Sequence, residues 1–115
     1  MAPDDYAVVA YKILSYLYEC IKGDVEPNIE KAREVAKVGD AYFHSVVDCL
    51  ISKGYAAGGC ARDMNGTIMD VFSLSVTLDG VEFLEENAKM RKVSEFLGKA
   101  FEKTLSVAVA ATAML

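Results

Sequence analysis

The sequence has little of what an enzyme, a membrane protein or a secreted protein needs. It has one histidine, His44, and its Gly58-Gly59 pair lacks the Lys-Ser or Lys-Thr that completes a phosphate-binding loop. The longest uncharged run, from Thr104 to Leu115, has 12 residues, whereas a membrane-spanning helix needs about 20. The N-terminus is acidic, whereas a signal peptide begins with basic residues. We therefore expect a cytoplasmic protein without a membrane span that is not an enzyme.

Cysteine and positive charge are also scarce. Cys20, Cys49 and Cys60 are widely spaced and form no Cys-x-x-Cys pair, so we expect reduced thiols, no metal site and no cofactor. The chain has 12 Lys and Arg residues against 17 Asp and Glu residues, which gives a net charge of −5. Such a chain repels nucleic acid unless its positive charge is concentrated locally. Its 115 residues, 53% of them hydrophobic, are enough for one globular unit with a single core.

Three helices are expected in the first half of the chain. Apolar residues recur at helical spacing from Tyr6 to Ile21. Asn28 is expected to cap a second, shorter helix, which ends at Gly39. A third helix follows, in which apolar residues from Phe43 to Ile51 keep the same spacing and Gly54 supplies the terminating residue. The short connection through Gly39 sets the second and third helices at a steep angle, which is typical of a helix-turn-helix.

A β-hairpin and a further helix are expected next. Tyr55 to Ala61 has the composition of a first strand, and Asn65-Gly66 is a strong hairpin-turn signal. The return strand alternates, with Phe72, Leu74 and Val76 expected to face inward. Thr77 then caps a helix whose inward residues are expected to include Leu78, Val81, Phe83 and Leu84. Together these elements predict an α+β fold, mostly α: a winged helix-turn-helix of three helices, a β-hairpin wing and one or two C-terminal helices.

The C-terminal segment is the second unusual element. Apolar residues keep helical spacing from Lys89 to Leu115, and a straight helix over this range would measure about 40 Å, longer than a domain of this size can cover. We therefore expect a winged-helix domain at residues 1–87 and a dimerising C-terminal helix at residues 88–115. The residues expected at the dimer interface are Val93, Phe96, Leu97, Ala100, Phe101, Leu105, Ala108 and Ala111. A helix on a membrane surface is the alternative, because the segment also carries Lys89, Arg91, Lys92, Lys99 and Lys103.

Two short segments carry a resemblance to known proteins. Lys53-Gly54-Tyr55 after an apolar helix, and Thr77-x-x-Gly80-x-x-Phe83-Leu84 after a hairpin, resemble small winged-helix proteins generally. The whole layout resembles the YjcQ-like family of small bacterial and phage-associated winged-helix proteins. In that family an Ile-Leu-rich first helix opens the domain, and a Thr/Gly/Leu-Glu-Glu-Asn segment precedes the final helix; here the segment is Thr77, Gly80, Leu84, Glu85, Glu86 and Asn87.

This resemblance covers residues 6 to about 100. It implies the fold and a role in DNA binding, and it implies no substrate. PadR-like and MarR-like regulators share the same layout, and their dimerising terminal helices resemble the C-terminal segment described above.

In such a fold the third helix would be the recognition helix for double-stranded DNA. Its outer face offers Tyr42, His44 and Ser45 to base edges. Phosphate contacts are expected from basic residues on this and neighbouring elements, namely Lys31, Arg33, Lys37, Lys53 and Arg62. The outer face, however, has no Arg, Lys, Asn or Gln, and it carries acidic residues at Asp40 and Asp48.

Because Arg or Lys to guanine is the commonest specific contact, this composition leaves two functional hypotheses open. One is a DNA-binding transcriptional regulator of bacterial or phage type. The other is a protein-interaction module that keeps the fold without binding DNA.

Two further patterns have an ordinary and a functional interpretation. His44 and Asp48 lie four residues apart, so they form either a general base with its orienting carboxylate or a surface pair. Tyr6, Tyr11, Tyr16 and Tyr18 of the first helix either line a ligand cavity or pack in and around the core.

Overall fold

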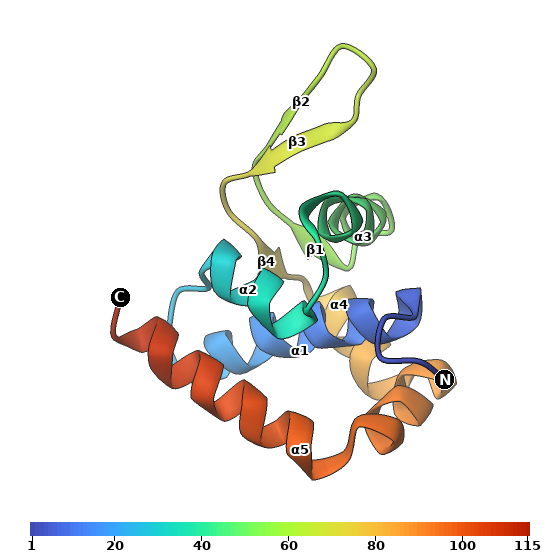
Figure 1. The fold of residues 1–115 in the computed structure, drawn as a ribbon, viewed down its shortest axis with the longest axis vertical. Coiled ribbons are helices and arrows are strands. Elements are labelled where there is room, and N and C mark those ends of the chain that lie inside the picture. The colour runs from blue at the N-terminus through green and yellow to red at the C-terminus, as the bar shows by residue number, and fades with distance from the viewer.

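The structure, a computed structural model, describes residues 1–115. It contains five helices and four short strands, in the order shown in Figure 1. The elements are α1 (Tyr6–Lys22), α2 (Ile29–Ala36), α3 (Asp40–Ser52), β1 (Ala56–Ala57), β2 (Cys60–Arg62), β3 (Ile68–Val71), β4 (Ser75–Val76), α4 (Leu78–Glu86) and α5 (Ala88–Ala113). This confirms the predicted α+β, mostly helical class, and the order of elements is that of a winged helix-turn-helix.

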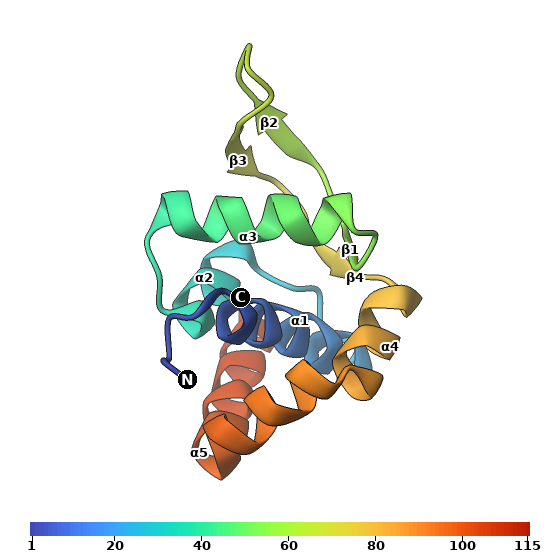
Figure 2. The same cartoon turned by 90° about the vertical axis from the view of Figure 1, so that its right-hand side faces the viewer.

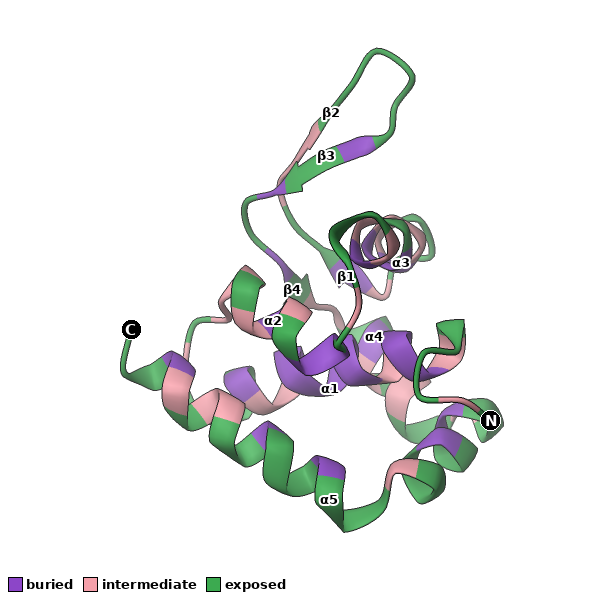
Figure 3. Cartoon of the chain, in the orientation of Figure 1, coloured by how far each residue is buried: buried purple, intermediate pink, exposed green.

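Helix α1 forms the centre of the core. It lies between α2 and α5 in Figure 1 and also contacts α3, α4 and β4. Its side chains are therefore covered on several sides, and Ile13, Leu14 and Leu17 have no solvent exposure. Figure 3 shows α1 as the most continuously buried element, with most of the wing exposed.

The wing is two short antiparallel ladders rather than one hairpin. β1 pairs with β4, whereas β2 pairs with β3 and has a register shift between Ala61 and Arg62. The chain passes so closely at Gly58 that a Cβ there would lie 2.0 Å from the carbonyl oxygen of Ser73. The ladder therefore breaks between the two pieces, as the Gly58-Gly59 pair indicates.

This break overturns part of the expected strand alternation. Phe72 is 67% exposed, so the prediction that it faces inward is wrong, whereas Leu74 is buried. The physical reason is that β3 ends at Val71, which takes the inward position, and regular alternation does not continue through residues 72–74.

The two segments that carry the family resemblance meet in one cluster, which we call the Thr77 junction (Gly54, Tyr55, Thr77, Gly80 and Phe83). The Thr77 hydroxyl donates to the carbonyl of Gly54 (2.6 Å) and accepts from the backbone N–H of Gly80 (3.0 Å). The Thr77 N–H donates to the carbonyl of Tyr55 (3.1 Å), and the rings of Tyr55 and Phe83 stack with centroids 4.3 Å apart. The junction thus joins the end of α3 to the start of α4.

The inward face of α4 differs from the expectation at one position. Leu78 is 74% exposed, so the prediction that it faces inward is wrong, whereas Val81, Phe83 and Leu84 are half-buried. In the first turn of α4, the residue that packs against the rest of the protein is Gly80, which lies against the backbone of Tyr55.

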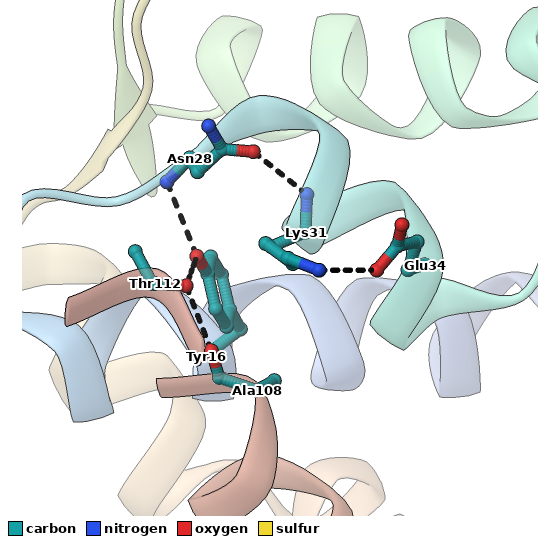
Figure 4. A network of polar contacts seen from close by, with 6 residues as sticks. All are labelled: Tyr16, Asn28, Lys31, Glu34, Ala108 and Thr112. Carbon is teal, nitrogen blue, oxygen red and sulfur yellow. Dashed lines mark hydrogen bonds and ion pairs between the residues drawn. The ribbon is translucent and has the colours of Figure 1, made fainter. Parts of the chain in front are cut away.

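Helix α5 occupies the expected C-terminal helical segment but is kinked, so the length of about 40 Å expected of a straight helix is not reached. Gly98 has φ 65° and ψ −160°, and residues after it turn back over α1. Figure 2 shows the two halves of α5 at a sharp angle. Phe101 and Leu105 consequently join the main core, and the Tyr16 hydroxyl donates to Thr112 Oγ1 (2.6 Å) near the C-terminal end of the helix (Figure 4).

Candidate nucleic-acid interface

Helix α3 and the β2–β3 hairpin form one open face of the protein. The hairpin projects beyond the body of the domain, and α3 lies beside its base (Figures 1 and 2). A cleft of about 640 Å³ between them is lined on one side by Asp40, His44, Ser45 and Asp48 and on the other by residues 65–69. The structure thus brings His44 and Ser45, two of the three candidate base-reading residues, to the cleft between α3 and the wing.

Both candidate arginines are paired with acidic residues of α3. Arg33 on α2 contacts Asp40 (Nη1 to Oδ1, 2.7 Å), and Arg62 on β2 contacts Asp48 (Nη2 to Oδ1, 3.1 Å). Arg62 Nη1 also donates to the carbonyl of Gly66 (2.8 Å), which ties it to the wing turn. All four charged side chains are at least 38% exposed, so these pairs contribute little to folding stability. They do cancel the positive charge of two of the residues predicted to contact phosphates.

The candidate lysines differ in their surroundings. Lys37 ends α2 in the left-handed conformation (φ 57°), and Lys53 follows the last residue of α3; both are exposed and neither has an ion-pair partner. Lys31, by contrast, contacts Glu34 one turn later (3.2 Å, Figure 4). Unpaired positive charge therefore lies near the two ends of α3 rather than along its face.

Tyr42 is engaged by the N-terminal segment. Its hydroxyl donates to the carbonyl of Asp4 (2.5 Å), and its ring lies 6.0 Å from that of Tyr6. Tyr6 in turn donates to the backbone carbonyl of Ser45 (2.9 Å). Burial raises the pKa of both tyrosines, and the carboxylates of Asp4 and Asp5 raise the pKa of Tyr42 further. Tyr42 consequently holds the N-terminal segment against α3 and is less free to contact a base than His44 or Ser45.

Sequence reasoning missed Lys12, which is 5% exposed in α1. Its Nζ donates to the carbonyl of Pro3 (3.3 Å). Burial lowers the pKa of Lys12, the neighbouring positive charge of Lys37 lowers it further, and Asp4 opposes the shift. The sequence did offer a signal: Lys12 follows Val8 and Val9 by four and three residues and so lies on the same apolar helix face. Both valines are buried in the structure.

Exposed apolar side chains on the wing were also missed. Met64 at the turn is fully exposed, and Met69 and Phe72 are 65% and 67% exposed. Alternation in the predicted strands assigned Phe72 to the core and gave the methionines no role.

The residues expected at a dimer interface divide into three groups by burial. Val93, Phe101 and Leu105 are buried within the chain; Leu97, Ala108 and Ala111 are half-buried; and Phe96 and Ala100 are exposed. The buried three are unavailable to a partner while α5 keeps its kink. The dimer itself stays a prediction.

The other patterns have modest structural counterparts. Tyr11 and Tyr18 line a pocket of about 390 Å³ between α1, α4 and α5, together with Arg91 and Glu102. Tyr16, in contrast, is fully buried in the core. No three His, Cys, Asp or Glu side chains gather in a way that could hold a metal ion, and no helix has both the length and the apolar character to cross a membrane.

Comparison with known proteins gives one match. The model of a family described as YjcQ protein matches residues 11–101, which extend from α1 to just past the kink in α5. Searches of curated proteins and of solved structures found no significant match.

Proposed function

The chain belongs to the YjcQ family, and on this premise we propose that it is a small DNA-binding regulator that contacts the duplex through α3 and the wing. The carrying observation is the arrangement of four cationic side chains around α3. Arg33 lies on α2 and Lys37 directly follows it, Lys53 directly follows α3, and Arg62 lies on β2. In a helix-turn-helix, contacts of this kind from neighbouring elements fix the protein on the phosphate backbone while the recognition helix enters the groove.

The composition of α3 limits this function to weak, mostly electrostatic binding. His44 and Ser45 are the polar side chains of α3 in the cleft that could donate to a base edge, and both lie near Asp40 or Asp48. Carboxylates repel the phosphate backbone, so affinity depends on the cations around the helix rather than on groups along it.

A salt titration with a random-sequence duplex tests the proposal. For phosphate contacts, the logarithm of the association constant falls linearly with the logarithm of salt concentration, by about 0.9 for each contact. We expect a slope of about −1.8 if only Lys37 and Lys53 bind phosphates, and about −3.6 if Arg33 and Arg62 leave their carboxylates and bind as well. The slope is measured from the fluorescence anisotropy of a labelled duplex titrated at several salt concentrations.

A double variant, Lys37→Ala with Lys53→Ala, removes the two unpaired lysines and is expected to flatten the slope by about 1.8. Lys89→Ala with Lys92→Ala makes the same charge change at exposed positions of α5 and serves as the matched control. Equal effects of the two double variants would assign binding to overall charge rather than to the α3 face. No binding of the native chain at low salt would remove the DNA hypothesis.

A specific observation favours the second candidate, a protein-interaction module. The wing presents Met64, Met69 and Phe72 to solvent, and its only cation, Arg62, is held by Asp48. Exposed methionine and aromatic side chains are typical of protein-binding surfaces rather than of DNA-binding wings. Absence of low-salt duplex binding is the result that supports this candidate over the first.

A further inference from the structure

The kink in α5 depends on a single residue. Gly98 has φ 65° and ψ −160°, a region of backbone conformation that is essentially restricted to glycine, while the residues on both sides are helical. A Cβ built at Gly98 has no atom within 4 Å. Space around the residue therefore does not require glycine, whereas the backbone conformation does.

Residues 99–113, which we call the C-terminal arm, pack one face on α1 and α2. Phe101 and Leu105 are each 8% exposed in the main core, and the Phe101 ring lies 5.9 Å from that of Tyr11. At the far end, Tyr16 donates to Thr112 and accepts from the N–H of Asn28 (3.1 Å, Figure 4).

Open space lies along both ends of these contacts. A surface groove of about 710 Å³ runs along the outer side of the contact between the end of α1 and the arm, and another of about 500 Å³ lies between residues 24–28 and the C-terminal end of the arm. The arm is thus packed along one face and exposed to solvent on its other faces.

We propose that the C-terminal arm exchanges between two copies of this chain, with Gly98 as the hinge. If Gly98 takes helical angles, α5 becomes one straight helix of 26 residues, about 39 Å long, and its second half leaves α1 of the same chain. The vacated surface of α1 is complementary to this arm, and therefore to the identical arm of a second copy. Reciprocal exchange closes a two-fold dimer that keeps every arm contact.

The exchange also accounts for the unbroken apolar spacing of α5. Val93 and Leu97 before the hinge continue in helical register with Phe101, Leu105 and Ala108 after it, as a continuous helix requires. In the exchanged dimer the arm residues contact the partner, so residues buried within the monomer become interface residues. The inference does not depend on DNA binding.

Gly98→Ala tests the hinge directly. Alanine strongly disfavours the kinked conformation and favours helix, by a factor of about ten or more per hinge, and a dimer has two hinges. We expect the dimerisation constant to rise about a hundredfold, which sedimentation velocity measures as a shift from monomer to dimer. Gly66→Ala is the matched control, since Gly66 also has positive φ (83°) and open space but lies in the wing turn.

A cysteine pair distinguishes arm exchange from ordinary association. A Cβ at position 23 lies 3.8 Å from Val109 Cγ1, so Gly23→Cys with Val109→Cys can bridge α1 and the arm. Without the hinge change the bridge should form within one chain. Combined with Gly98→Ala it should join two chains, giving a dimer band on a non-reducing gel, whereas the hinge variant with native cysteines alone should not.

Three results would overturn the proposal. One is a folded Gly98→Ala variant that stays monomeric at every concentration, and another is a dimer whose cysteine bridge remains within the chain. The third applies if Gly98→Ala does not fold. In that case the cysteine-pair variant with native Gly98 is refolded at increasing protein concentrations, and the proposal is contradicted if the fraction of interchain bridges does not rise with concentration.

Discussion

Asparagine at both positions 40 and 48 is expected to strengthen duplex binding roughly tenfold at low salt and to steepen the salt dependence by up to about 1.8. The two changes, Asp40→Asn and Asp48→Asn, remove the carboxylates that contact Arg33 and Arg62 at 2.7 and 3.1 Å. Each arginine then becomes available to a phosphate, and the repulsion between α3 and the DNA backbone falls. Anisotropy titrations at several salt concentrations measure both quantities.

The fold should survive this double change. Exposed ion pairs contribute about 0–1 kcal/mol, so the melting temperature is expected to fall by only a few degrees. Glu82→Gln with Glu86→Gln is the matched control, because it makes the same charge change at exposed positions of α4, away from the wing (Figure 2). A comparable gain in the control would show that net charge limits binding, and no gain in the α3 variant would show that the two aspartates do not restrain the arginines.

The sequence was enough to name the candidate residues but not to show that the arginines are paired with carboxylates. The cations around α3 could be named because each lies on or next to an element that the sequence predicts. The pairs Arg33–Asp40 and Arg62–Asp48 depend instead on the angle between α2 and α3 and on where the wing returns to α3. Similarly, the bond from Tyr42 to Asp4 joins residues 38 positions apart, which no local pattern indicates.

The fold shows the same division between local and long-range determinants. Helical spacing and terminating residues predicted α1 to α4 because those signals act within one element. Gly98 gives no such signal, since one glycine inside a helical pattern costs only about 1 kcal/mol and the apolar spacing continues across it. Its conformation is decided by the docking of Phe101 and Leu105 on α1, a contact between the two ends of the chain.

Gly80→Ala is expected to destabilise the protein by about 3 kcal/mol, the upper range for inserting a methyl group into a closely packed site. A Cβ at position 80 would lie 2.0 Å from the carbonyl oxygen of Tyr55 and 2.8 Å from Val76 Cγ2. Tyr55 would have to move, which weakens its carbonyl's bond to the Thr77 N–H and its stacking on Phe83. Thermal unfolding followed by circular dichroism should show a loss of about 10 °C or more.

Gly39→Ala provides the contrast, because Gly39 has φ −73° and no atom within 4 Å of a built Cβ. Because Gly39 is the N-cap residue of α3, where alanine is less favourable than glycine, that variant is expected to lose no more than about 1 kcal/mol. Equal melting temperatures for the two variants would contradict a required close approach at Gly80. The expected difference would give a physical meaning to the Thr77-x-x-Gly80 segment, which connects the end of α3 to the start of α4. The segment that carries the family resemblance would then be a requirement of the fold, and what the chain binds would depend on residues outside it, first of all Asp40 and Asp48.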